Sequence, residues 1–268
     1  MKTFVIGDIH GGYRALLEVL KNSNFDYEKD TLISLGDVVD GWSETHLVIE
    51  ELMKIKNLIL LKGNHDDWAI KSICTKYQEE LSENAFTRSV VEENYSRNFW
   101  NMHGEAYSWL AQGGFSTLQS YENNMHLMID HITFLSKARN YYVDSDNRLF
   151  VHAGGISKGK SLNEVKISDF YWDRSFWYKM WEGRNNGKDW YEIYLGHTPT
   201  LNFNKAGEDN TKPIKRKNVW NMDTGACYTG KLSMMNLETK ELFQSVPVWT
   251  LYPLEIGRNH QSYNQYIS

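Results

Sequence analysis

KTFVIGDIHG, residues 2–11, is an apolar run that ends in a glycine and polar residues, and the same pattern returns in TLISLGDVVD (31–40) and LILLKGNHD (58–66). Residues 13–21 between the first two runs place leucines on one helical face, and a second helical pattern begins near Ser43 as its N-cap. Short strands that alternate with helices predict an α/β fold built on a right-handed βαβαβ unit. Its parallel sheet is expected to be covered on both faces.

The sequence pattern changes at residue 68. Residues 68–139 are polar, aromatic and mostly helical in pattern, which predicts a helical insertion or lid inside a single domain spanning residues 1–268. Further strands are expected at 141–143, 148–151, 191–195, 219–222, 231–237 and 241–244, the first two of them joined as a hairpin. Residues 205–217 are interpreted as a surface loop, and residues 257–268 as a polar tail.

Composition excludes several classes of protein. Hydrophobic residues make up 41% and charged residues 24%, which is typical of a globular protein. The net charge of −5 gives no broad cationic surface for nucleic acid. No apolar run is long enough to span a bilayer and no secretory signal is evident, so a cytoplasmic protein is expected. The two cysteines have neither metal-ligand nor disulfide spacing.

Polar motifs stand at the expected ends of the strands. They are GDIHG (7–11), GDVVD (36–40), GNHD (63–66), VHAGG (151–155) and LGHT (195–198). Functional groups of an open α/β sheet gather at the carboxyl ends of its strands, so these turns are expected to meet along one edge. Histidine, aspartate and an asparagine amide without any thiolate form a ligand set that suits Mn, Fe or Zn.

The number of ligands points to two cations. From the residues alone, the first cation is assigned Asp8, His10 and His197, the second Asn64 and His152, and Asp37 is the carboxylate that bridges them. Two bridged cations about 3.5–4 Å apart clamp the attacking and leaving oxygens and lower the pKa of bound water toward about 7. The sequence therefore predicts a two-metal hydrolase whose nucleophile is water.

Two further residues and the glycines complete this site. His65 is not needed as a ligand when Asn64 is one, so it is the candidate general acid, with Asp40 to orient and stabilise it. The glycines that precede the ligands are expected to let the chain turn sharply and to let metal and phosphate approach the backbone.

These motifs, in this order and at these intervals, resemble the calcineurin-like metallophosphoesterases of the phosphoprotein phosphatase family. The bacterial and bacteriophage protein phosphatases and the diadenosine tetraphosphatases are the most similar branches, and the resemblance covers residues 2 to about 226. It implies a four-layer αββα sandwich with a two-metal site at one edge, Mn²⁺ being the expected metal and Fe or Zn the alternatives. It implies one metal on Asp8, His10 and Asp37, and the other on Asp37, Asn64, His152 and His197. It also pairs Asp40 with His65 as the acid.

The resemblance extends to the groups that contact phosphate. Arg174, which follows Trp172, matches a phosphate-binding arginine of bacterial members, and Asn64 is expected to contact phosphate as well as metal. Asp223 falls in a segment that lies near the site in the family, without an assigned role. One departure stands out, because the family usually continues the second motif as Asp-Arg-Gly, whereas Gly41 follows Asp40 here.

That departure leaves alternatives open. Arg14, the cation nearest in sequence to a metal motif, is a candidate substitute, and Trp42 is a candidate for stacking on an aromatic leaving group. The leading hypothesis is a serine/threonine protein phosphatase, with dual specificity conceivable, acting on phosphoproteins or small phosphomonoesters. The Asp66 ending of the third motif resembles the dinucleotide-cleaving branch, which makes a bis(5'-nucleosyl)-tetraphosphatase the alternative. A phosphate-binding scaffold without turnover is the third hypothesis, and only the missing arginine supports it.

Overall fold

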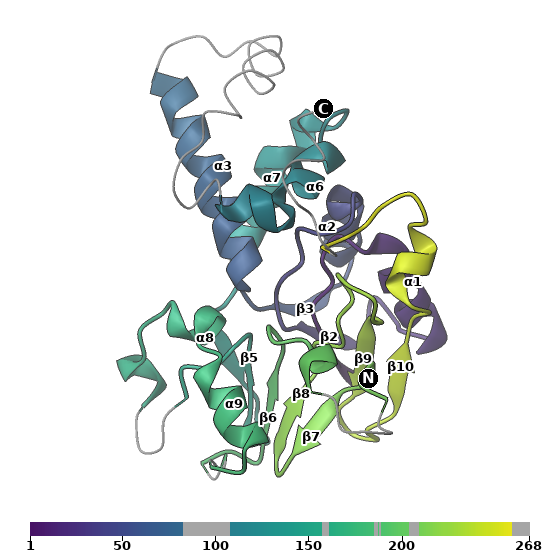
Figure 1. The fold of residues 1–268 in the computed structure, drawn as a ribbon, viewed down its shortest axis with the longest axis vertical. Coiled ribbons are helices and arrows are strands. Elements are labelled where there is room, and N and C mark those ends of the chain that lie inside the picture. Colours follow the sequence, from purple (N-terminus) through teal and green to yellow (C-terminus); the bar gives the residue numbers. More distant parts are fainter. Residues whose placement is uncertain (83–107, 157–160, 185–186, 188, 204–208, 259–268) are drawn as a thin grey trace.

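Two mixed β-sheets form the centre of the molecule (Figure 1). The computed structural model describes the chain apart from residues 83–107, 157–160, 185–186, 188, 204–208 and 259–268. The first sheet has the order β10-β9-β1-β2-β3 and contains β1 (Thr3–Ile6), β2 (Thr31–Ser34), β3 (Asn57–Leu60), β9 (Ser233–Asn236) and β10 (Leu242–Gln244). β1, β2 and β3 are parallel, which confirms the expected βαβαβ unit.

The second sheet has the order β4-β5-β6-β8-β7. Its strands are β4 (Tyr141–Val143), β5 (Arg148–Val151), β6 (Glu192–Leu195), β7 (Ile214–Arg216) and β8 (Val219–Asn221). The expected hairpin of β4 and β5 is confirmed by their antiparallel pairing. The interpretation of residues 205–217 as loop throughout was wrong at β7, for which β8 is the one partner strand in the described part of the chain. An edge strand can stay polar because one side of it faces no other strand, so it lacks the apolar signal of a buried strand.

Alternation along the strands produces four layers. Phe4 and Ile6 of β1 pack in a cluster with the helices α1 (Tyr13–Asn22) and α2 (Thr45–Met53), whereas Val5 packs against the second sheet. On β5, Phe150 faces the first sheet, and its neighbours pack toward α8 (Asp169–Trp172) and α9 (Ser175–Trp181). Successive strand residues point to opposite faces, and both faces are covered. The αββα sandwich is thus confirmed.

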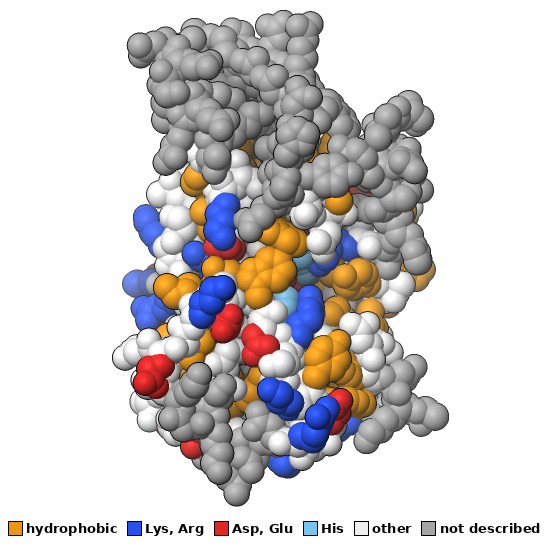
Figure 2. Space-filling model, turned by 60° about the vertical axis from the view of Figure 1, so that its left-hand side comes forward, with side chains coloured by type: hydrophobic (Ala, Val, Ile, Leu, Met, Phe, Trp, Pro, Cys, Tyr) orange, Lys and Arg blue, Asp and Glu red, His pale blue; other side chains and the backbone are white. Residues whose placement is uncertain are grey.

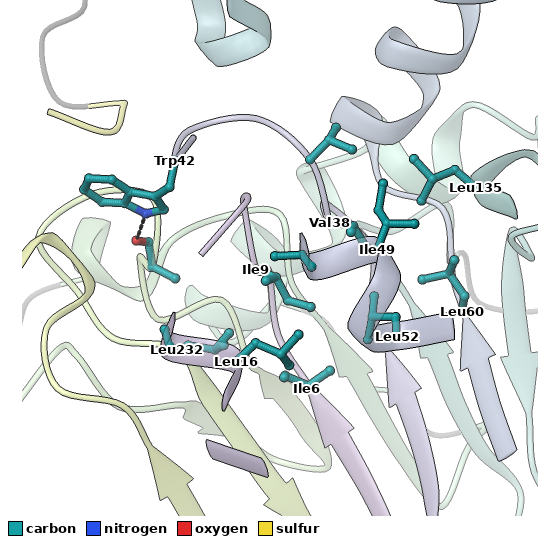
Figure 3. Close-up of a cluster of buried hydrophobic side chains, with 14 of the residues drawn as sticks. Ile6, Ile9, Leu16, Val38, Trp42, Ile49, Leu52, Leu60, Leu135 and Leu232 are labelled. Carbon is teal, nitrogen blue, oxygen red and sulfur yellow. Dashed lines mark hydrogen bonds between the residues drawn. The ribbon is translucent and has the colours of Figure 1, made fainter. Parts of the chain in front are cut away.

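Helices of the middle segment join the first core cluster. They are α3 (Asn64–Ser82), the π-helical turn η2 (Leu110–Gly114), α6 (Phe115–Ser120) and α7 (Met125–Ser136). Leu135 of α7 lies in the same cluster as Ile49 and Leu60 (Figure 3). We propose on this basis that residues 68–139 are a helical insertion in a single domain, although residues 83–107 lie outside the described part.

The remaining helices are short 3-10 turns, and two boundaries differ from expectation. The turns are η3 (Leu162–Glu164), η4 (Thr200–Asn202) and η5 (Val248–Leu251). Ser43 does not cap α2, because its hydroxyl donates to Glu255 Oε1 at 2.7 Å. Gly257 is buried rather than part of a free tail, since it packs against the indole of Trp42. No helix among the described residues is long and apolar enough to cross a membrane.

Candidate metal centre

The five predicted motifs meet at the carboxyl ends of β1, β2, β3, β5 and β6. The turns are tied together by their backbones: His10 N donates to Asp37 O at 2.9 Å, and Gly196 N donates to His152 O at 2.8 Å. Figure 2 shows histidine surface in pale blue at the centre of one face, with cationic and apolar surface beside it. The convergence that the sequence predicted is therefore present in the fold.

The first ligand group consists of Asp8, His10 and Asp37, whose ligand atoms lie within 4.8 Å of one another. His10 Nδ1–H donates to the carbonyl of Val39 at 3.0 Å, so Nε2 is the nitrogen that faces Asp37 Oδ2, at 3.6 Å. Burial lowers the pKa of His10 from 6.5 to about 4. The ring is therefore neutral near pH 7, which is the form that binds metal.

The second group consists of Asp37, His152 and His197 within the same 4.8 Å limit. His152 Nδ1–H donates to Leu35 O at 2.8 Å, and Nε2 lies 3.4 Å from Asp37 Oδ2 and 3.2 Å from Asn64 Oδ1. The distances thus group His197 with Asp37 and His152, as the family resemblance implies, rather than with Asp8 and His10. Asp37 belongs to both groups, the position expected of a bridging carboxylate.

The charges of these groups fit a cation. Asp8 Oδ1 is buried and has no hydrogen-bond partner within the described part of the chain. Burial, followed by the nearby charge of Asp223, raises the pKa of Asp8 well above its ordinary value. Burial lowers the pKa of His152, but the Asp37 carboxylate outweighs it and raises that pKa to about 9. Buried carboxylates that stand this close together call for positive charge between them.

The Asp40 carboxylate is the most enclosed acid of the site. His65 Nδ1 lies 2.6 Å from Asp40 Oδ2, and the backbone N–H of His65 donates to Asp37 Oδ1 at 2.9 Å. Trp109 Nε1 donates to Asp40 Oδ2 at 2.9 Å, and the Thr117 hydroxyl donates to Asp40 Oδ1 at 2.7 Å. Burial raises the pKa of Asp40 and lowers that of His65, each well away from its ordinary value. The helical segment therefore supplies two of the donors that hold the pair.

Asp66 has a structural task that the sequence did not reveal. Its carboxylate accepts the backbone N–H groups of Asp37 at 2.8 Å, Val38 at 2.9 Å and Gly63 at 2.9 Å. Burial and the neighbouring Asp37 raise its pKa to about 6. Asp66 thus ties the second and third motifs to each other and orients the turn that carries Asp37. A carboxylate three residues after a glycine at a helix start was the available signal.

Four residues of the site have an unusual backbone conformation. His10, Asp37, Asp40 and His197 all have φ between 51° and 71°, a region that non-glycine residues rarely occupy. Of the glycines that precede the ligands, Gly36 alone needs a positive φ, of 100°. The others are required because another motif touches them: a Cβ on Gly63 would collide with the Asp37 carboxylate. That these glycines also let metal and phosphate approach the backbone stays a prediction.

The candidate phosphate-binding arginines differ in position. Arg174 donates from Nη1 to His197 O at 2.7 Å and to the Thr198 hydroxyl at 3.0 Å, so it lies beside the second ligand group. It also lines a groove of about 510 Å³ together with Tyr178, Pro199, Leu201, Asn202, Tyr228 and Thr229. Arg14 pairs with Glu44 at 2.8 Å and donates to Leu251 O at 2.6 Å. Phosphate contact by either residue stays a prediction.

Trp42 cannot stack on a substrate. The side chain is fully buried, its ring stacks on Tyr252 with centroids 5.0 Å apart, and its Nε1 donates to Ala226 O at 2.9 Å (Figure 3). The candidate role of Trp42 in stacking on an aromatic leaving group is therefore wrong, because Tyr252 and Gly257 cover its ring.

Comparisons with known proteins agree with the geometry of the site. The family model described as calcineurin-like phosphoesterase matches residues 1–223. A curated relative from Buchnera aphidicola subsp. Baizongia pistaciae, named bis(5'-nucleosyl)-tetraphosphatase, symmetrical, is 22% identical over 91% of this chain and 97% of its own length. One of the same name from Methylobacillus flagellatus is 23% identical over 91% and 95%.

Solved structures share the fold at low identity. The crystal structure of a putative diadenosine tetraphosphatase aligns with a TM-score of 0.59 at 16% identity, covering 91% of this chain and 92% of that one. The cold-active protein-tyrosine phosphatase of a psychrophilic Shewanella species aligns with a TM-score of 0.52 at 14% identity, covering 92% and 78%. At these identities the likeness concerns the fold alone.

Proposed function

The chain belongs to the calcineurin-like phosphoesterases, and from that premise we propose that it hydrolyses dinucleoside polyphosphates with the help of two divalent cations. The observation that carries the choice of substrate is the match to curated relatives named symmetrical bis(5'-nucleosyl)-tetraphosphatase over 91% of this chain and nearly all of their own length. Symmetrical cleavage of such a substrate gives two nucleoside diphosphates.

The proposed ligands follow the two groups. Asp8, His10 and Asp37 hold one cation, and Asp37, Asn64, His152 and His197 hold the other, with Mn²⁺ as the expected metal. When bound, the cations supply a water of lowered pKa and neutralise charge on the phosphate. The hydrogen bonds from His10 and His152 to backbone carbonyls orient both rings before any cation arrives.

We assign to the Asp40–His65 pair the donation of a proton to the leaving group. Asp40 Oδ2 lies 2.6 Å from Nδ1 of His65 and engages that nitrogen in a hydrogen bond. Nε2 is therefore the nitrogen that exchanges a proton with the substrate. Asp40 fixes the orientation of the His65 ring, and its own position is held by Trp109 and Thr117. A general acid of this kind contributes about 10²- to 10⁴-fold, and it matters most when the leaving oxygen is strongly basic.

The groove beside Arg174 supports a substrate larger than a simple phosphate. Its volume of about 510 Å³ lies within the range of ligand pockets. Tyr178 and Tyr228 offer aromatic surface for a nucleoside, while Arg174 connects the groove to the second ligand group through His197 O. A substrate with a phosphate chain and a base at its end matches this combination of charge and aromatic surface.

The test compares substrates under identical conditions. Diadenosine tetraphosphate and a phosphoserine peptide are each incubated with the Mn²⁺-loaded protein, and with the protein after chelator treatment, and products are separated by chromatography. We expect ADP as the nucleotide product, a strong preference for the dinucleotide, and loss of turnover after chelation. A preference for the peptide, or equal rates with and without metal, would refute this proposal.

Serine/threonine protein phosphatase activity is the second candidate. The observation that favours it is the enclosed Asp40–His65 pair, since a serine alkoxide is a poor leaving group that needs an acid, whereas a nucleoside diphosphate needs it far less. His65→Asn should therefore lower peptide turnover by about 10²-fold or more and dinucleotide turnover by a smaller factor. The exposed His126 provides the control His126→Asn, which should change neither rate.

A scaffold that binds phosphate without turnover is separated by the same variant. In a scaffold, His65→Asn leaves phosphate and metal binding unchanged, and the unsubstituted protein shows no hydrolysis of any substrate. Metal content measured by mass spectrometry distinguishes loss of the acid from loss of the cations, because His65 belongs to neither ligand group. Turnover of any phosphoester by the Mn²⁺-loaded protein would end the scaffold hypothesis.

A further inference from the structure

The turn after Asp40 disfavours any residue with a side chain at position 41. Gly41 has a φ of 107°, a conformation that strains any residue with a side chain. A Cβ at Gly41 would lie 3.2 Å from His10 O and 3.4 Å from the Cβ of Cys227. The side chain of any residue at this position would press against His10, which belongs to the first ligand group. A cation near Asp40 must come from elsewhere in the chain.

The C-terminal segment is docked on this same turn. Glu255 accepts the Ser43 backbone N–H at 3.0 Å, and Tyr252 stacks on Trp42. Gly257 has a φ of 58° and packs directly against the Trp42 indole. These contacts bring Arg258, the last described residue, beside the site, where its backbone N–H donates to Cys227 O at 2.9 Å.

The Arg258 side chain lies between the Asp40 turn and the groove. A Cβ on Gly113 would be 3.3 Å from the Cγ of Arg258, and the carbonyl of that glycine accepts the Gly41 N–H at 3.4 Å. The guanidinium carbon lies 5.5 Å from the ring centre of Tyr228, which lines the groove, and Nη2 donates to Gln112 Oε1 at 3.4 Å. The side chain is partly exposed, so a ligand can reach it.

Among the described residues, no ion pair neutralises the charge of Arg258. Within the described residues its side-chain hydrogen bond goes to an uncharged amide oxygen. The point 3.3 Å from its Cγ at which a Cβ of Gly113 would stand is also 3.3 Å from the Cβ of Asp40, so the two side chains approach the same turn of the helical segment. Arg14, by contrast, directs its guanidinium to Glu44 and Leu251 O and stacks on Tyr252.

We propose that Arg258 binds a non-bridging oxygen of the substrate phosphate and so supplies the cation that the motif lacks after Asp40. The inference rests on phosphoester chemistry at the metal centre and not on which phosphoester is the substrate. A planar guanidinium suits a phosphate oxygen because its N–H donors match the geometry of the anion. The proposal also gives the C-terminal segment, residues 252–258, a part in substrate binding.

The test measures phosphate binding apart from turnover. Isothermal titration of the Mn²⁺-loaded protein with inorganic phosphate is compared for the native chain, Arg258→Gln and Arg258→Lys. One charge-assisted hydrogen bond corresponds to a weakening of about 10- to 100-fold in Arg258→Gln, with Arg258→Lys in between. In parallel, kcat/KM for p-nitrophenyl phosphate should fall by about 10²-fold or more. Arg184→Gln, at an exposed arginine paired with Glu182, is the control and should change neither quantity.

Several outcomes would overturn the inference. The first is a phosphate Kd for Arg258→Gln within twofold of the native value, and the second is the absence of phosphate binding by the native Mn²⁺-loaded protein. A purely structural role is recognised by a lower melting temperature with unchanged phosphate affinity. Arg258→Ala with added guanidinium chloride at millimolar concentration adds a rescue experiment, in which recovered kcat/KM is expected. Calorimetry needs no turnover. If the protein were inactive on every substrate, the proposed function would be refuted, but the phosphate affinities would still decide the role of Arg258.

Discussion

Replacing Thr117 by valine removes the hydroxyl that holds Asp40 and leaves the shape of the side chain almost unchanged. The Thr117 hydroxyl donates to Asp40 Oδ1 at 2.7 Å and accepts the Asp40 N–H at 2.9 Å, and both residues are fully buried. A buried hydrogen bond to a charged group contributes about 1.5–3 kcal/mol, and a neutral one about 0.5–1.5 kcal/mol. Thr117→Val should therefore lower the free energy of unfolding by about 2–4 kcal/mol.

The measurement is urea denaturation followed by circular dichroism, with a thermal melt as a second readout. For a chain of this size, the loss corresponds to a melting temperature lower by roughly 5–15 °C. Thr117→Ser keeps the hydroxyl and should lose about 1 kcal/mol for the missing methyl group. Thr133→Val, on the exposed side of α7, should stay within about 0.5 kcal/mol of the native chain.

The comparison of the two variants at position 117 decides the matter. If Thr117→Val and Thr117→Ser lose the same free energy, the hydroxyl contributes nothing and the reasoning about Asp40 is refuted. Turnover adds a second criterion, because a less firmly held Asp40 orients the ring of His65 less well. Thr117→Val should accordingly lower kcat more than KM, in the same direction as His65→Asn but by a smaller factor.

Two further predictions concern packing and pH. Gly63→Ala drives a methyl group into the Asp37 carboxylate and should abolish Mn²⁺ binding measured by calorimetry. The control Gly183→Ala, with φ of 75° and no described atom within 4 Å of the added Cβ, should cost only about 1 kcal/mol of backbone strain and leave Mn²⁺ binding unchanged. Equal effects of the two variants on Mn²⁺ binding would contradict the packing argument. Burial raises the pKa of the Glu192 carboxyl. Hydrogen bonds from Lys240, Tyr194 and Trp220 outweigh burial, so the pKa lies below its ordinary value of 4.5. The stabilisation is present above that value and lost as pH falls through the lowered pKa, so the difference in unfolding free energy between native and Glu192→Gln should be constant near pH 7 and shrink as the pH falls below 4.5. A difference that grows on acidification would show the opposite sign.

Much of the fold was readable from local pattern. The apolar runs that end at Gly7, Gly36 and Gly63 predicted parallel strands, because a strand buried on both faces needs continuous apolar residues. The motifs predicted that Asp37 would lie among the histidines, since parallel strands bring their carboxyl ends to one edge of the sheet. Polar edge strands such as β7 gave no comparable signal, and residues 205–217 were misread for that reason.

The kinds of side chain at the site, and the sheet edge on which they gather, follow from the order of the amino acids, since strand period and the rules of βαβ connection are local. Their surroundings depend on distant segments: Thr117 and Trp109 hold Asp40 from more than 60 positions away in the chain, and Arg258 comes from the C-terminal segment. The burial of Trp42 is of the same kind. Which surfaces meet across such distances depends on how whole layers pack, and no short stretch of sequence encodes that.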